Sequence, residues 1–254
     1  MSVDALRERI DSDVKMIALT HVPTSGGLVN PAAEIGAVAR EAGIPFLLDA
    51  CQSVGQLPID VRDLGCDVLS ATGRKFLRGP RGTGFLYVRQ ELADDLVPHS
   101  LDARSATWMS PREYTIEPGA RRFETWEHSV ATRIGLGVAV DHALSWGLDE
   151  IAGRNAGLAD QLRSSLADIP GVTVRDKGLH KSAILTFTVA GVPSSDVGAR
   201  LRRDGINSSV ATPAFAQCMA PRGLTDMVRA SVHYYNTDGE VDRLVAAVRS
   251  ISVP

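Results

Sequence analysis

Short apolar runs that alternate with a helix-like segment constrain the fold of this 254-residue chain more than any other feature. Residues 15–20 and 45–49 are apolar runs typical of buried strands. Residues 32–42 between them have helical character, with Pro31 before the segment and Gly43 after it. Alternating strand and helix signals are typical of a parallel sheet covered by helices. We therefore predict an α/β fold with a mostly parallel sheet for the N-terminal half.

The C-terminal half has a different pattern, in which a long helical stretch precedes a mixture of strands and helices. Residues 129–166 have helical character with a break near Gly147, and the chain from Gly171 onward has an α+β pattern. The predicted elements of that part are strands at 172–175, 183–189 and 227–235, a helix that begins near Ser195 as its capping residue, and a final helix at 238–249. The predicted domains are a large domain (1–128), a long connecting helical segment (129–168) and a small C-terminal domain (169–254).

Composition narrows the possible functions. The formal net charge of -3 gives no reason to expect nucleic acid or an anionic membrane as a partner. No signal peptide or membrane-spanning segment is recognisable, so we predict a cytoplasmic location. Three widely spaced cysteines, Cys51, Cys66 and Cys218, indicate neither a disulfide framework nor a zinc site, and we predict no metal. Residues 89–118, which contain Trp108, are predicted to be a long surface excursion or a subunit contact.

A single lysine stands out in the turn that follows the strand-like run 67–71. Thr72, Gly73 and Arg74 precede Lys75, and a glycine-rich segment follows it. A lysine at a strand end has two chemical uses, as a point charge on phosphate or as an amine that forms a Schiff base. The competing interpretation is a solvated basic turn.

Polar residues also follow the other predicted strands, at Thr20 to Thr24 and at Asp49 to Gln52. Ligands of open α/β sheets bind at the carboxyl ends of strands, so we expect these groups to face one crevice. A pyridine cofactor needs an amine, a carboxylate for its ring nitrogen, a donor to its ring oxygen, and hydroxyl and cationic groups for its phosphate. The chain has each type, although Asp49 can also be a helix cap, Gln52 a surface residue and Arg74 half of a salt bridge.

Three segments, 48–55, 72–75 and 79–84, closely resemble the class V aminotransferase family of pyridoxal phosphate (PLP) enzymes. That family includes cysteine desulfurases, carbon-sulfur lyases and isopenicillin N epimerase-like proteins. The resemblance implies the PLP-dependent transferase fold type I, here a partial large domain with a mostly parallel sheet plus a C-terminal α+β small domain. It also implies PLP as cofactor, an amino acid substrate and a homodimer.

The resemblance assigns roles to five residues around the cofactor. It makes Lys75 the catalytic Schiff-base lysine and Asp49 the partner of the pyridine nitrogen. It makes Gln52 a donor to the ring oxygen, and Thr72 and Arg74 the phosphate-binding pair.

Two further residues match more distant positions of the family pattern. Thr24 falls where many relatives place an asparagine beside the ring. Arg229 lies in the C-terminal motif 228–237, whose arginine binds the substrate's α-carboxylate. A fork of donors suits that group, and an ion pair at the edge of the core is the alternative.

The reaction is less constrained than the cofactor. Cys218 precedes Arg229 but is out of the desulfurase register, so we predict a buried apolar thiol there. Trp126 and Glu127 stand where desulfurases carry small residues and threonine. We therefore expect a carbon-sulfur lyase that works by β-elimination, with a class V aminotransferase or an epimerase as alternatives.

The family's usual N-terminal third, with its phosphate loop and stacking aromatic residue, has no counterpart before residue 15. A truncated, non-catalytic homologue is therefore a further alternative.

Overall fold

The computed structural model describes residues 2–214 and 216–252, which form two compact units. Unit 1 comprises Met1–His21, Pro31–Val54 and Ile59–Ser145, and unit 2 comprises Val22–Asn30, Gly55–Pro58 and Trp146–Pro254. Two short segments of the N-terminal half thus belong with the C-terminal unit. Their residues lie in loops, which carry no periodic pattern from which this could have been predicted.

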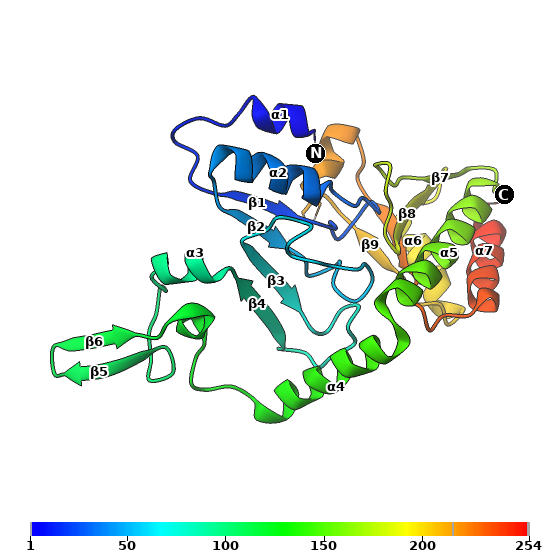
Figure 1. Ribbon diagram of the computed structural model, residues 1–254. Helices are drawn as coiled ribbons and strands as arrows, with labels where there is room; N and C mark the ends of the chain where they lie inside the picture. The colour runs from blue at the N-terminus through cyan, green and yellow to red at the C-terminus, as the bar shows by residue number, and fades with distance from the viewer. Residues whose placement is uncertain (1, 215, 253–254) are drawn as a thin grey trace. The chain divides into compact units, whose positions relative to one another are not determined.

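The centre of unit 1 is a four-stranded sheet in the order β1-β2-β3-β4. Its strands are β1 (Ile17–Thr20), β2 (Phe46–Asp49), β3 (Val68–Thr72) and β4 (Gly84–Val88). β1, β2 and β3 run parallel, and β4 is antiparallel to β3 (Figure 1). The prediction of a mostly parallel sheet is therefore confirmed.

Helix α2 (Ala32–Ala42) packs on this sheet because one of its faces is apolar. Ile35 and Ala39 are fully buried in a core that also contains Phe46 and Leu48 of β2. The helix ends at Gly43, whose φ of 66° is the left-handed conformation that glycine adopts without strain. The helix predicted at 32–42 and its glycine stop are both confirmed.

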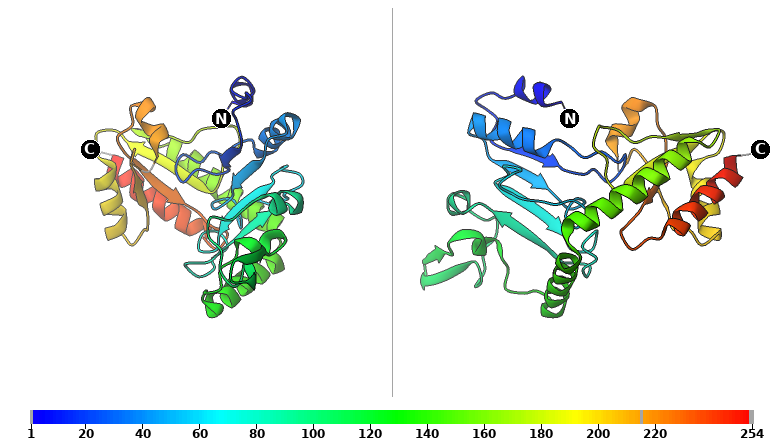
Figure 2. Two further views of the ribbon diagram at one scale, coloured as in Figure 1. Left: turned by 90° about the vertical axis from the view of Figure 1, so that its left-hand side faces the viewer. Right: turned by 45° about the vertical axis from the view of Figure 1, so that its right-hand side comes forward.

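The remainder of unit 1 consists of smaller elements and one long helix. They are α1 (Val3–Arg7), α3 (Gln90–Asp95), β5 (Ala106–Ser110), β6 (Glu113–Ile116), the 3-10 helix η1 (Gly119–Phe123) and α4 (Val130–Trp146). The predicted surface excursion thus contains a short helix and the two-stranded β5–β6 hairpin (Figure 2). Trp108 and Tyr114 pack edge to face on that hairpin and are both exposed.

Unit 2 is built on an antiparallel sheet in the order β7-β8-β10-β9. Its elements are α5 (Leu148–Ala167), β7 (Val172–Val174), β8 (Ile184–Val189), α6 (Ser194–Arg203), β9 (Ser209–Ala211), the 3-10 helix η2 (Gln217–Arg222), β10 (Met227–Ser231) and α7 (Asp238–Ser252). Figure 2 shows α5 and α7 side by side. The α+β prediction is confirmed, and Gly147 separates α4 from α5 as expected.

Two predicted boundaries in unit 2 are wrong. Helix α6 begins at Ser194 after Pro193, and no side chain caps it, so Ser195 is not its cap. Strand β10 ends at Ser231 rather than at 235, because His233 and Asn236 form a turn in which the His233 N–H donates to Asn236 Oδ1 at 2.9 Å. Within residues 2–214 and 216–252, no helix is long and apolar enough to cross a membrane.

Candidate functional site

The carboxyl ends of three neighbouring strands bring the first group of predicted residues together in unit 1. In the parallel ladder, Thr20 of β1 is paired with Asp49 of β2, and Asp49 is paired with Ser70 of β3. Thr72 ends β3, and the turn that contains Lys75 follows directly. The polar ends of these strands therefore lie at the same edge of the sheet, and the expectation that they face one crevice stays a prediction.

Asp49 is held on both carboxylate oxygens. The Thr20 hydroxyl donates to Oδ2 at 3.3 Å, and the Cys51 backbone N–H donates to Oδ1 at 3.0 Å. The Asp49 backbone carbonyl accepts from the His21 N–H at 3.0 Å. The half-buried carboxylate therefore has a defined plane and direction.

The Lys75 turn is closed by backbone hydrogen bonds. Gly73 N–H donates to Thr83 O at 2.9 Å, and Gly79 N–H donates to Gly73 O at 2.7 Å. A side chain at residue 73 would place its Cβ only 2.3 Å from Thr83 Oγ1, so any larger residue would displace Thr83 from this turn. Lys75 is half-buried, and its carbonyl accepts from the Arg78 N–H at 2.9 Å. The lysine thus stands on a constrained turn rather than on a loose basic loop.

The charges of Asp49 and Lys75 both act on the thiol of Cys51, a residue that was not among the predicted site residues. Burial raises the pKa of the Cys51 thiol, a hydrogen bond and the negative charge of Asp49 raise it further, and the positive charge of Lys75 opposes the shift. The pKa of this one thiol therefore responds to both Asp49 and Lys75. The position of Cys51 between Asp49 and Gln52 in the sequence could have indicated that it belongs to the site.

Two competing interpretations of the predicted cofactor residues can be compared with the structure. Gln52 is only 5% exposed, so it is not a surface polar residue. Arg74 is exposed and makes no ion pair with any acidic side chain in the part of the chain that the structure describes. Thr72 is half-buried, and its hydroxyl donates to Thr83 O at 3.4 Å.

The other two predicted residues, Thr24 and Arg229, lie in unit 2. Arg229 sits on β10, half-buried, and donates to Ser231 Oγ at 3.2 Å and to Thr24 Oγ1 at 3.4 Å. Burial lowers the pKa of this guanidinium. Among residues 2–214 and 216–252 it has no acidic partner, so the proposed alternative of an ion pair at the core edge is wrong within that part of the chain.

Cys218 contradicts its prediction. It is an exposed thiol in η2, not a buried apolar one, because the buried side chain of this turn is its neighbour Met219. Burial was predicted because Cys218 is out of the desulfurase register, but a 3-10 turn points successive side chains in different directions.

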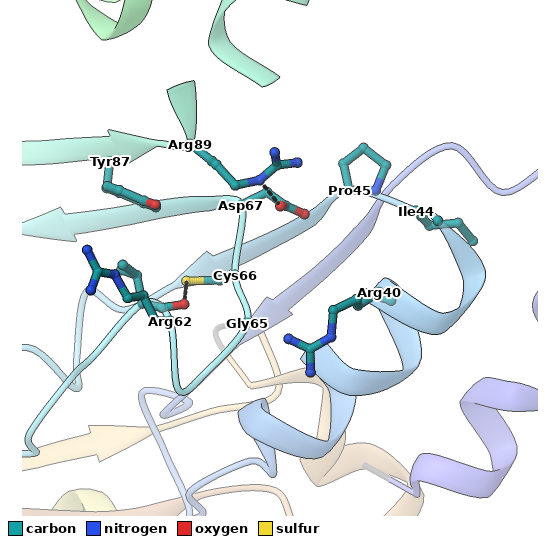
Figure 3. Close-up of a pocket in the computed structure, with 12 residues that line it drawn as sticks. Arg40, Ile44, Pro45, Arg62, Gly65, Cys66, Asp67, Tyr87 and Arg89 are labelled. Carbon is teal, nitrogen blue, oxygen red and sulfur yellow. Dashed lines mark hydrogen bonds and ion pairs between the residues drawn. The ribbon is translucent and has the colours of Figure 1, made fainter. Parts of the chain in front are cut away.

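A separate cavity of about 410 Å³ lies at the opposite edge of the unit 1 sheet, where β2 and β3 begin (Figure 3). Arg40, Arg62 and Arg89 line it, but Arg89 is paired with Asp67 at 2.7 Å, and all three arginines are exposed. None of the predicted site residues lines this cavity. No group of three or more histidine, cysteine or acidic side chains among the described residues could hold a metal ion.

Sequence comparison places these features among known proteins. The profile of the family "Aminotransferase class-V" matches residues 1–244. A cysteine desulfurase of Synechococcus elongatus is 33% identical over 98% of this chain and 40% of its own length. A probable cysteine desulfurase of Methanothermobacter thermautotrophicus is 29% identical over 97% of this chain and 63% of its own length. This chain therefore spans less than two thirds of either relative.

Solved structures show the same fold. The apo cysteine desulfurase of Thermococcus onnurineus superposes with a TM-score of 0.93 and 26% identity, covering 99% of this chain and 63% of that one. The cystine C-S lyase C-DES, solved with its product cysteine persulfide, has a TM-score of 0.85 and 25% identity, covering 97% and 64%. A mutant of C-DES has been solved with glycine covalently linked to its PLP cofactor. The fold is thus fold type I, and the protein belongs to the aminotransferase class-V family.

Proposed function

We propose that this chain carries the lysine-bearing part of a PLP-dependent enzyme that breaks a carbon-sulfur bond in an amino acid. One observation carries the proposal: Asp49 and Thr72 lie at the ends of adjacent parallel strands, and Lys75 stands in the turn that follows Thr72. Gln52 and Arg74 are beside them in the sequence. Relatives named for cysteine desulfuration and cystine cleavage support the choice of a sulfur-containing substrate.

The donor set of unit 1 fits PLP. The half-buried amine of Lys75 suits the aldehyde of PLP, and the carboxylate of Asp49, held on both oxygens, suits the ring nitrogen. The buried amide of Gln52 suits the ring oxygen. Arg74 is exposed and has no acidic partner among the described residues, so its charge is available for a phosphate. PLP, when bound, supplies an electron sink for negative charge at the substrate's α carbon.

The side chains of this chain would then do the following work. Lys75 holds the cofactor through its Nζ atom and, once released, removes the α-proton at that same atom. Asp49 keeps a proton on the ring nitrogen, because a fixed carboxylate favours a cation beside it. Thr24 contributes a hydroxyl beside Arg229, whose guanidinium binds the α-carboxylate.

Borohydride reduction tests the cofactor assignment. The protein is incubated with PLP, reduced and digested, and the peptides are analysed by mass spectrometry. A pyridoxyl group on Lys75, absent in Lys75→Ala, is expected. Labelling of other lysines without Lys75 would contradict the proposal and favour the alternative of a non-catalytic homologue.

Cysteine desulfuration is the second candidate, and the exposure of Cys218 favours it. A desulfurase converts L-cysteine to alanine and transfers the sulfur to a protein thiol, whereas β-elimination yields pyruvate, ammonia and a sulfur product. Measuring both products from L-cysteine and L-cystine separates the two. Alanine formation that is lost in Cys218→Ser would establish desulfuration, while pyruvate formation that persists in that variant would establish elimination. Amino transfer to a keto acid or racemisation of the substrate would support the aminotransferase or epimerase alternatives.

We further propose that the protein is a homodimer. Helix α4 supports this, because Val130, Ile134 and Val138 recur at a spacing of four along one face and are each more than 60% exposed. Light scattering of the protein and of Ile134→Glu tests the proposal, and a monomeric wild-type protein would contradict it. A cytoplasmic location stays a prediction.

A further inference from the structure

We propose that Thr20 is a positioning residue for the cofactor: its hydroxyl fixes the Asp49 carboxylate in the orientation that pairs with the ring nitrogen. The inference rests on the proposed function, because it concerns how Asp49 is presented to PLP. It adds a residue from β1 that the motifs around Asp49 and Lys75 do not contain.

The contact joins two strand ends at equivalent positions. Thr20 and Asp49 are paired in the parallel ladder, and the Thr20 hydroxyl lies 3.3 Å from Asp49 Oδ2. The next residue, His21, donates its N–H to the Asp49 carbonyl at 3.0 Å. The end of β1 therefore holds both the backbone and the side chain of Asp49. The donor stands on a strand whose position the ladder sets, and a β-branched side chain has few rotamers, so little orientational freedom remains.

The geometry leaves the carboxylate able to bind a cation. An ionised carboxylate accepts about four hydrogen bonds, two on each oxygen. Thr20 occupies a site on Oδ2 and the Cys51 backbone N–H occupies one on Oδ1, whereas the Cys51 thiol lies 3.9 Å from the Ser70 carbonyl. A site remains for the ring N–H of the cofactor. Without Thr20, Oδ2 would lose a neutral donor and the carboxylate could rotate about its χ2 bond.

The test compares Thr20→Val, which keeps the shape and removes the hydroxyl, with Thr20→Ser, which keeps the hydroxyl. Thr115→Val is the matched control, since it makes the same change at an exposed position of β6. PLP affinity is measured by fluorescence titration, and the pH midpoint of the visible absorbance band is measured for each protein. One hydrogen bond to a charged group corresponds to about a tenfold change in affinity. We expect about tenfold weaker PLP binding and a raised pH midpoint for Thr20→Val, with wild-type values for Thr20→Ser and Thr115→Val.

Two further arms separate positioning from general damage. An analogue of PLP whose ring nitrogen is replaced by carbon cannot pair with Asp49, so wild type and Thr20→Val should bind it equally. In an Asp49→Asn background, Thr20→Val should have no additional effect on the pH midpoint. Equal PLP affinity and an equal pH midpoint in wild type and Thr20→Val would overturn the role of Thr20 and leave the proposed function unaffected. A loss that is the same for the carbon analogue would also overturn it. A wild-type protein that forms no adduct at Lys75 would overturn the proposed function, and this inference with it.

Discussion

Two arginines of unit 2, Arg163 and Arg229, are both withdrawn from solvent but differ in the groups that their guanidinium atoms contact. Arg163 of α5 is 9% exposed, and its Nε lies 2.8 Å from Oδ2 of Asp176, whose side chain is fully buried. Its Nη2 atom also donates to the carbonyls of Ser182 and Ile184. Arg229 is half-buried, and within residues 2–214 and 216–252 its guanidinium donates hydrogen bonds only to the hydroxyl groups of Thr24 and Ser231.

The difference lies in how the charge is compensated. A guanidinium removed from water must regain its interactions, and Arg163 does so entirely within the protein. Neutral hydroxyls do not neutralise Arg229, so its charge remains available to an anion from solution. Arg163 therefore has a structural role, and the proposal that Arg229 binds an anion predicts a different response to mutation.

The largest expected effect comes from breaking the compensated pair. Arg163→Met should lower the free energy of unfolding by about 3–5 kcal/mol, because it leaves Asp176 buried with an unpaired charge. Urea denaturation measures the loss, and Asp176→Asn in the same background should recover part of it. A loss no larger than that of an exposed arginine would contradict the structural role of Arg163.

A smaller effect, on binding rather than stability, is expected for Arg229→Gln. The variant should bind an unreactive amino acid such as glycine about 10- to 100-fold more weakly, the equivalent of one charged hydrogen-bonded contact. Perturbation of the cofactor's absorbance by glycine measures the affinity, and the urea midpoint should stay close to that of wild type. A large loss of stability with unchanged affinity would make Arg229 resemble Arg163.

The smallest effect is expected at an exposed pair, Arg154 and Asp238, whose closest atoms are 3.1 Å apart. Arg154→Met should change the unfolding midpoint only slightly, because solvent screens the interaction. The hydrogen bond and charge of Arg154 lower the pKa of Asp238 in the folded protein, so the pair stabilises the protein above the carboxylate's unfolded pKa. This contribution disappears as the pH falls through the lowered folded value. The difference between wild type and variant should therefore be larger at neutral pH than in acid, and a constant difference would contradict it.

Much of the fold could be predicted from the local sequence, because helix periodicity and glycine stops depend on interactions between residues only a few positions apart. The apolar face of α2, the glycine stop at Gly43 and the break at Gly147 were all predictable from neighbouring residues. The wrong predictions concern a helix cap and the burial of a side chain, both of which depend on residues that are close in space. The cap of α6 was assigned to Ser195, and Cys218 was expected to be buried, although Met219 fills the interior instead.

The amino-acid sequence by itself determined the alternation of strands and helices and the spacing of Asp49, Gln52 and Lys75, which together indicate the family. Such features depend on periodicity and on short motifs. Only the tertiary structure decided that Thr20 reaches Asp49 across 29 positions and that Arg229 meets hydroxyls rather than a carboxylate. The physical reason is that register between strands and compensation of a buried charge depend on residues brought together by packing, which no local pattern specifies.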